Sequence, residues 1–172
     1  MRFKRGLLFL AVMGLAHLLF TLPAHPTELE MQRETLRGLT GLYVYVDILG
    51  NTKDLFDIDA IRVDAELKLR MAGIKVLSTK EIKPPGTPYL LVRLIIRRTP
   101  DLPSFYYSAN VWLVQSVYLE RNPSIHLSGL TWVVSRLGYV GEEHLSMIRD
   151  RIKDQIDIFI NDYLSVNPKG GK

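Results

Sequence analysis

The chain has no cysteine among its 172 residues. This absence excludes disulfide bonds, thiol catalysis and thiolate zinc sites, and it excludes the lipid-modified cysteine that anchors bacterial lipoproteins. A glycosylation acceptor of the form Asn-x-Ser/Thr is also missing, because proline occupies the middle of the near match Asn122-Pro123-Ser124. Secreted eukaryotic domains of this size commonly carry both features, so the sequence favours a bacterial protein.

The sequence patterns of several catalytic sites are missing as well. There is no glycine-rich phosphate loop, and Ser128-Gly129 lacks the flanking glycine of a nucleophile elbow. The spacing of His126 and His144 does not match the His-Glu-x-x-His pattern of a zinc hydrolase. We therefore predict no catalytic residue, no cofactor and no metal ligand, and we favour a non-catalytic protein.

The first 24 residues have the composition of an export signal. Arg2, Lys4 and Arg5 form a basic head, an apolar run extends from Gly6 to Phe20, and Ala24 supplies a small residue for a peptidase. As a helix, the apolar run would span roughly 22 Å, less than the ~30 Å hydrocarbon core of a bilayer. We predict a signal peptide over residues 1–24 that is cleaved after Ala24, and a retained membrane anchor is the alternative.

Removal of this segment changes the charge of the protein. Three of the 22 Lys and Arg residues and none of the 18 Asp and Glu residues lie in residues 1–24, which leaves 19 basic against 18 acidic residues. A nucleic-acid-binding domain would carry a clustered basic surface, so we expect no nucleic acid as a partner. We expect a periplasmic or secreted protein whose partners belong to the bacterial envelope, and membrane association only if the segment is retained.

The remaining chain divides into three parts. Thr27 and Glu30 have the spacing of a capping box, which predicts a brief helix over 28–37 within an N-terminal lead of residues 25–40. Residues 41–167 have the length and patterning of a single α/β domain. We predict that the polar tail, residues 168–172, is disordered.

Hydrophobic periodicity predicts the elements of this domain. They are, in order, strands at 42–48 and 74–77 with a helix ending near Ala72 between them, strands at 89–98, 105–120 and 127–139, and a helix at 142–166. The first strand, helix and strand imply a right-handed crossover and a parallel pair, and the next three strands imply an antiparallel meander. The predicted fold is α+β, a two-layer sandwich of about five mostly antiparallel strands with two helices on one face.

The first of these helices has apolar residues on two sides. One strip would face the sheet, and Ala60, Val63, Leu67 and Met71 form a second strip. We expect this second apolar strip to pack against another part of the chain or another protein. The candidates are the C-terminal helix, the N-terminal segment and a partner protein. Gly73 is expected to end the helix in the left-handed conformation.

Two acidic clusters precede the predicted helices. Asp54, Asp57 and Asp59 could bind calcium, but the positions that need Gly and Glu in an EF-hand loop hold other residues, so helix capping is the favoured interpretation. Glu142 and Glu143 are likewise attributed to the dipole of the last helix rather than to a metal site with the nearby histidines.

The side chains of the sheet that face away from the helices form the candidate binding surface. We assign partner binding to the aromatic and arginine residues Tyr43, Tyr45, Tyr89, Arg93, Arg97, Tyr106, Trp112 and Tyr118. Tyr, Trp and Arg are enriched at the centres of protein interfaces. Strands also favour aromatic residues, so coverage of this face by a loop or by a second copy is the alternative.

Several stretches of the mature chain carry a family resemblance. They are Arg33 to Leu39, Leu42 to Ile48, Glu66 to Ile74, Pro88 to Leu90, and Ile160 to Leu164. Together they resemble a group of uncharacterised exported bacterial proteins, and this resemblance implies no activity. The element order is similar to that of small α/β domains in envelope-assembly proteins, such as the lipopolysaccharide-assembly lipoprotein and the TolB amino-terminal domain, which concerns the fold alone.

These observations give three functional hypotheses. The leading one is a non-catalytic envelope protein that binds a protein or a ligand through the aromatic and arginine-rich sheet face. The second is a hydrolase that acts on an envelope polymer through His126 or His144 and a nearby carboxylate. The third is a structural homo-oligomer, such as a homodimer.

Overall fold

A computed structural model describes residues 26–50, 55–82 and 86–168. The chain divides between Glu30 and Met31 into two units, the second of which begins at Met31. The predicted signal peptide, residues 1–24, and residues 169–172 of the predicted tail lie outside the described residues. The capping box is confirmed, because the Thr27 amide donates to the Glu30 carboxylate at 2.6 Å and the Glu30 amide donates to Thr27 Oγ1 at 3.3 Å. It opens helix α2 (Glu28–Glu34).

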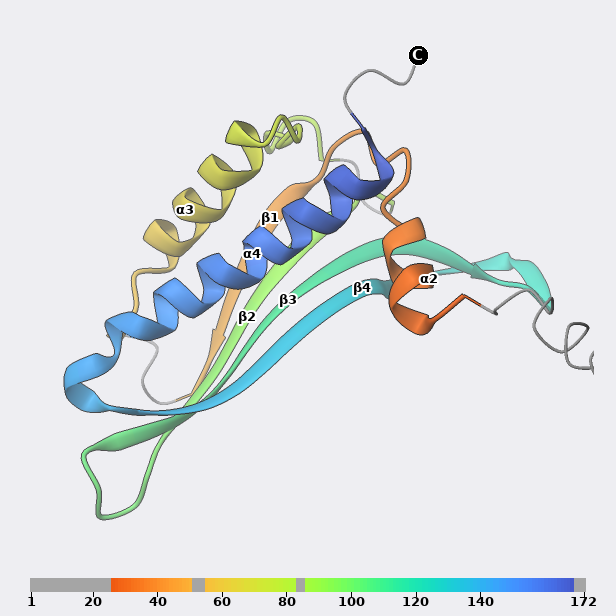
Figure 1. Ribbon diagram of the computed structural model, residues 1–172. Coiled ribbons are helices and arrows are strands. Elements are labelled where there is room, and N and C mark those ends of the chain that lie inside the picture. The colour runs from red at the N-terminus through yellow and green to blue at the C-terminus, as the bar shows by residue number, and fades with distance from the viewer. Residues whose placement is uncertain (1–25, 51–54, 83–85, 169–172) are drawn as a thin grey trace, which may run out of the picture. The chain divides into compact units, whose positions relative to one another are not determined.

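The second unit is built on one four-stranded sheet. Its strands are β1 (Tyr43–Leu49), β2 (Tyr89–Arg98), β3 (Ser104–Leu119) and β4 (Asn122–Gly141), in the spatial order β1-β2-β3-β4. β1 and β2 are parallel, and the other two pairs are antiparallel. Helices α3 (Ile58–Met71) and α4 (Ser146–Val166) pack on the same face of the sheet, over β1 and β3 respectively (Figure 1). The α+β class and the antiparallel meander are therefore confirmed.

The prediction of about five strands is wrong by one. Residues 74–77 form no strand, and Val76 makes only an isolated parallel bridge to Leu42. A turn at Ser78 follows directly, where the Glu81 carboxylate accepts hydrogen bonds from the Ser78 amide and hydroxyl at 2.9 Å each. This turn leads the chain away from β1, so pairing on this outer edge of β1 ends after the single bridge, while β2 pairs with the other side of β1.

The ends of α3 agree with the predicted signals. Asp57 caps the helix, because its Oδ1 accepts a hydrogen bond from the Ala60 amide at 3.0 Å. Gly73 has a φ of 84°, and the Ile74 amide reaches back to the Leu69 carbonyl at 2.9 Å, which closes the last turn. Asp54 lies outside the described residues.

The last helix begins later than predicted. Glu142–His144 form a separate 3-10 turn, and α4 starts at Ser146 with no acidic residue in its first turn. The attribution of Glu142 and Glu143 to the dipole of the last helix is therefore wrong. Glu142 is held instead by Arg98, whose Nη2 lies 2.6 Å from Glu142 Oε2. The backbone N–H of Glu142 also donates a hydrogen bond to the Pro103 carbonyl.

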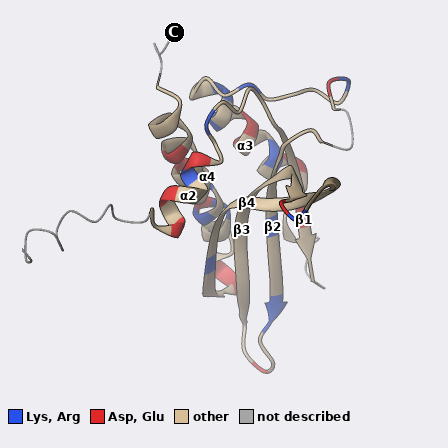
Figure 2. Ribbon diagram, turned by 90° about the vertical axis from the view of Figure 1, so that its right-hand side faces the viewer, with Lys and Arg blue, Asp and Glu red and all other residues tan. Residues whose placement is uncertain are grey.

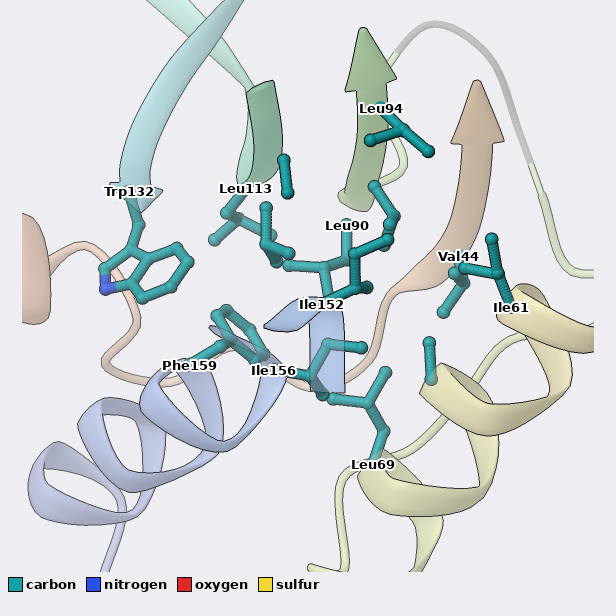
Figure 3. Close-up of a cluster of buried hydrophobic side chains, with 14 of the residues drawn as sticks. Val44, Ile61, Leu69, Leu90, Leu94, Leu113, Trp132, Ile152, Ile156 and Phe159 are labelled. Carbon is teal, nitrogen blue, oxygen red and sulfur yellow. The ribbon is translucent and has the colours of Figure 1, made fainter. Parts of the chain in front are cut away.

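The core lies between the sheet and the two helices. Alternate residues of each strand meet one stripe of α3 and one stripe of α4 (Figure 3). Fully or almost fully buried members are Ile61, Ala65, Leu69, Leu90, Val92, Leu94, Ile96, Phe105, Ala109, Val111, Leu113, Trp132, Ile148, Ile152, Ile156 and Phe159. Burial of this apolar surface is the main force that holds the helices on the sheet.

The second apolar strip of α3 stays exposed. Val63, Leu67 and Met71 are all more than half exposed, and no element among the described residues covers them. The C-terminal helix passes beside this strip and contacts α3 through ion pairs, because Asp64 binds Arg149 and Lys68 binds Asp157. The prediction that the C-terminal helix could cover the second apolar strip of α3 is therefore wrong.

We expect the substitution Asp64→Asn to lower the free energy of unfolding by at most about 1 kcal/mol at neutral pH. Hydrogen bonds from Arg149 at 2.6 Å and Lys153 at 3.3 Å hold the pKa of Asp64 below its usual value of 3.8, against the opposing effect of burial. Because the folded-state pKa is lowered, this stabilisation is present above the unfolded pKa and is lost as the pH falls through the folded pKa.

Urea unfolding at neutral and acidic pH checks this expectation. The difference between wild type and Asp64→Asn should shrink in acid and in high salt. Asp59→Asn is the matched control, because Asp59 forms its ion pair with Arg62, three residues away on the same helix. An equal loss at both pH values would contradict the assignment of the effect to this ion pair.

Candidate functional site

The strands direct a second set of side chains away from α3 and α4. We call this set the outer face; it comprises Tyr43, Tyr45, Asp47 and Leu49 of β1, Tyr89, Leu91, Arg93, Ile95 and Arg97 of β2, Tyr106, Ser108, Asn110, Trp112 and Val114 of β3, and Leu130, Val133, Ser135, Leu137 and Tyr139 of β4. No helix in the described part of the chain covers it. In Figure 2 the four strands lie side by side and carry few charged residues.

A polar strip crosses the middle of the outer face and joins all four strands. Asp47 of β1 accepts a hydrogen bond from Arg93 of β2 at 2.9 Å, and the Arg93 guanidinium lies 5.8 Å from the ring centroid of Trp112 on β3. Trp112 Nε1 then donates to the hydroxyl of Ser135 on β4 at 3.1 Å. Each of these polar side chains has a partner on the next strand, so the strip is held rigid before any ligand arrives.

Several outer-face residues are buried although no helix lies over them. Leu91 is 6% exposed, Val114 is 4% exposed and Asn110 is 4% exposed. Asn110 is satisfied locally, because its amide nitrogen donates to the backbone carbonyls of Arg93 and Ser108. The large neighbouring side chains, including the Trp112 ring, therefore pack against the sheet rather than extend into solvent.

Three tyrosines form a cluster at the start of β1 and β2. The rings of Tyr43 and Tyr89 stack with centroids 5.1 Å apart, and Tyr45 meets Tyr89 edge to face at 6.4 Å. Partial burial raises the pKa of Tyr43, and the neighbouring Tyr89 and Tyr45 raise it further. The Tyr43 phenol therefore stays a neutral hydrogen-bonding group at physiological pH.

The opposite end of the outer face carries a second aromatic pair and a cation. Tyr106 and Tyr139 lie 5.3 Å apart, and the Tyr139 hydroxyl donates to Ser104 Oγ at 2.6 Å. Tyr106 is 57% exposed. Arg97 lies on the strand beside Tyr106 and makes no ion pair with any described residue.

The eighth predicted residue, Tyr118, lies apart from the other seven. β3 pairs with β2 only as far as Val114, so the stretch of β3 that holds Tyr118 pairs with β4 alone. Tyr118 packs against His126 across this two-stranded extension, with ring centroids 6.2 Å apart. The structure thus brings Tyr43, Tyr45, Tyr89, Arg93, Arg97, Tyr106 and Trp112 onto one continuous surface and leaves Tyr118 beyond its end.

The sequence interpretation missed the contribution of β4. Val133, Leu137 and Tyr139 are exposed on the outer face, and Leu137 is the most exposed of all, at 83%. The sequence signal for them is that Val133, Leu137 and Tyr139 share one parity along β4, with the polar Ser135 between them. It becomes readable only when the register of β4 on β3 is known.

The two candidate catalytic histidines are not brought together. His126 lies near the start of β4 and His144 lies just after its end, so roughly 50 Å of strand separates them at about 3.3 Å per residue. His144 Nε2 lies 3.6 Å from Glu143 Oε1, and both side chains are well exposed. Within the described residues no cluster of three His, Asp or Glu side chains could hold a metal ion.

A shallow pocket of about 450 Å³ lies beside the tyrosine cluster, between β1 and α3. Two arginines of α3 line it, but Arg62 is paired with Asp59 and Arg70 is paired with Glu66 at 2.8 Å. The charges of this pocket are therefore already neutralised, and it offers no unpaired group that would select an ionic cofactor.

No helix in the described ranges combines the length and the apolar character needed to cross a membrane. Comparison of the chain with protein-family models and with curated proteins finds no match, so its function has to be inferred from its own residues and geometry.

Proposed function

We propose that the chain is a non-catalytic protein of the bacterial envelope that binds a partner protein through the outer face. The observation that carries this proposal is an uncovered sheet face whose aromatic and apolar side chains are exposed while its central polar groups are paired with one another. Export to the envelope rests on the composition of residues 1–24.

The composition of the outer face is that of an interface centre. Tyr, Trp and Arg supply large contact areas at a small cost in side-chain entropy, and they dominate measured binding hot spots. Arg93 and Trp112 lie in the middle of the surface, and their geometry is fixed by Asp47 and Ser135. A partner that docks here therefore meets side chains that are already ordered, which reduces the entropic cost of binding.

The shape of the surface favours a protein over a small molecule. Small-molecule sites are concave and enclose most of their ligand. The outer face instead extends over four neighbouring strands, from Tyr45 on β1 to Leu137 on β4. An exposed apolar surface of this extent on a monomeric domain typically marks an interaction site for another macromolecule.

The partner should be found by crosslinking at defined positions in intact cells. A photo-crosslinking amino acid in place of Ile95 on the outer face should yield a discrete adduct with one envelope protein. The same amino acid in place of Leu67, which is exposed on the far side of α3, is the control and should not yield that adduct.

We expect the double substitution Arg93→Ala with Trp112→Ala to weaken capture of this partner by roughly 100-fold or more, because each residue lies at the centre of the surface. The double variant Val63→Ala with Leu67→Ala truncates two exposed apolar side chains on α3 instead and should leave capture unchanged. Circular dichroism must show that both variants are folded. Unchanged capture by the folded Arg93 and Trp112 variant would overturn the proposal.

A further inference from the structure

One edge of the sheet is open over the second half of β4. Among the described strands β4 pairs only with β3, so every second residue of β4 directs its backbone N–H and C=O away from the sheet. The Val133 amide points outward, because it donates to Gln32 Oε1 at 3.2 Å, and the Thr131 carbonyl accepts from Thr35 Oγ1 at 3.1 Å. By alternation, the outward groups that follow are those of Ser135, Leu137 and Tyr139.

These outward groups lack hydrogen-bond partners in the described part of the chain, and only one charged side chain protects this edge. In the described ranges, no side chain or backbone group is hydrogen-bonded to them. Natural edge strands are usually guarded by lysine, proline or a bulge. Between Val133 and Tyr139, β4 has no lysine, proline or bulge, and its one protecting charge is that of Arg136, which faces the helix side. By contrast, the Leu42–Val76 bridge covers the start of β1 at the other edge of the sheet.

We propose that a second copy of this chain pairs antiparallel with the open edge of β4, about a two-fold axis at Leu137. Leu137 then lies opposite Leu137 of the second copy, and Ser135 lies opposite Tyr139 of the second copy. All of these residues direct their backbone groups outward, so they form hydrogen-bonded pairs and contribute about six backbone hydrogen bonds. The same patch serves both copies, as a two-fold interface requires.

The side chains on the helix side of the edge are compatible with this register. Arg136 lies opposite Gly138 of the second copy, so no like charges meet across the axis. The Tyr107 ring lies over Gly138, since a Cβ added there would be 2.4 Å from its Cζ. The guanidinium of Arg136, which has no ion-pair partner among the described residues, would reach the Tyr107 ring of the second copy and form a cation–π contact.

The outer faces of the two copies become continuous in this register. The row Leu49, Ile95, Ser108 and Leu137 crosses one copy, and the equivalent row of the second copy continues it beyond Leu137. Edge pairing over so few residues makes an interface near the lower size limit for a specific complex. We therefore expect a dimer that forms and dissociates with protein concentration.

The absence of cysteine from the chain allows a direct test on the full-length protein. Two residues in a hydrogen-bonded antiparallel pair have Cα atoms about 5.5 Å apart, within the range of a disulfide. Under mild oxidation, Leu137→Cys should form a covalent dimer. Leu130→Cys is the matched control, because Leu130 is also exposed on β4 but lies outside the proposed pairing. Equal crosslinking of the two variants would overturn the proposal.

Light scattering at increasing concentration tests the backbone contribution separately. Ser135→Pro removes an outward N–H at an edge position, where proline is tolerated, and should remain monomeric. Ser135→Ala keeps this N–H and loses only the hydroxyl bonded to Trp112, so it should dimerise like the wild type. A wild type that stays monomeric would contradict the proposal, and so would a folded Ser135→Pro variant that dimerises normally. The Arg93 and Trp112 double variant should still dimerise, which separates this test from that of the proposed function.

Discussion

Replacing Gly50 by alanine is expected to lower the free energy of unfolding by roughly 3 to 5 kcal/mol. Gly50 follows β1 with a φ of 135°, a backbone conformation that side-chain-bearing residues rarely adopt. A Cβ at this position would lie 2.1 Å from the backbone carbonyl oxygen of Ile96. The substitution therefore combines backbone strain with an overlap against another strand.

The neighbouring strand cannot move to relieve this overlap. Ile96 is fully buried in the core, and it is paired with Tyr107 on β3. Movement of the Ile96 carbonyl would disturb both the pairing of β2 with β3 and the packing beneath it. The overlap can therefore be relieved only by distorting the backbone at the end of β1, where the chain leaves the sheet toward α3.

Gly86→Ala is the control that separates the two causes. Gly86 has a similar φ of 118°, but a Cβ there would meet nothing within 4 Å. We expect this control to lose only the cost of the unfavourable φ, on the order of 1 to 2 kcal/mol. Chemical denaturation followed by circular dichroism measures both values. Equal losses for Gly50→Ala and Gly86→Ala would show that the Ile96 carbonyl is not an obstacle.

Local patterns predicted most elements of this fold correctly. Alternation with a period of two located β1 to β4, and the capping residues Asp57 and Gly73 fixed the ends of α3. Residues 74–77 also show strand-like composition, yet they form only one bridge. Such a short apolar run forms a strand only if the chain continues alongside its neighbour. The turn at Ser78 ends the pairing here, and the composition of residues 74–77 does not indicate this turn.

The register of β4 is the feature that sequence could not supply. Strict alternation would place Leu130 and Trp132 on the same side of the sheet. An irregularity in the pairing between Leu113 and Val114 leaves Thr131 without an opposite residue, so Leu130 faces outward and Trp132 faces the core. The polar groups of Thr131 are satisfied by Thr35 and Gln115, residues distant in sequence. This stabilisation becomes visible only in three dimensions.

Seven of the eight predicted site residues lie together on the outer face. Tyr45, Arg93 and Trp112 share the outer face because each lies on a strand whose alternation is uninterrupted through the sheet. Tyr118 has the same parity on β3 but lies past the point where β2 ends. The extent of a neighbouring strand, unlike its periodicity, is set by packing across the whole sheet, so alternation along β3 alone does not show that Tyr118 lies beyond the end of β2.

Replacing Trp132 by alanine is expected to lower the free energy of unfolding by roughly 3 to 5 kcal/mol. Trp132 is 2% exposed, and its ring meets Phe159 of α4 edge to face with centroids 5.1 Å apart (Figure 3). Its Nε1 also donates to Asp162 Oδ2 at 3.0 Å, while Arg33 binds the other oxygen of this carboxylate at 2.7 Å. One side chain thus joins β4 to α4 by both packing and a hydrogen bond.

Trp132→Phe separates these two contributions. Phenylalanine keeps an aromatic ring against Phe159, but it lacks the Nε1 donor and has a slightly smaller side chain. We therefore expect the free energy of unfolding to fall by about 1 to 2 kcal/mol. The chain has only two tryptophans, and Trp112→Phe as a background makes the fluorescence of Trp132 the single reporter of unfolding in the parent protein. Circular dichroism follows the variants that lack Trp132. If Trp132→Phe costs as much as Trp132→Ala, the hydrogen bond to Asp162, and not the ring packing on Phe159, holds this end of α4 to the sheet.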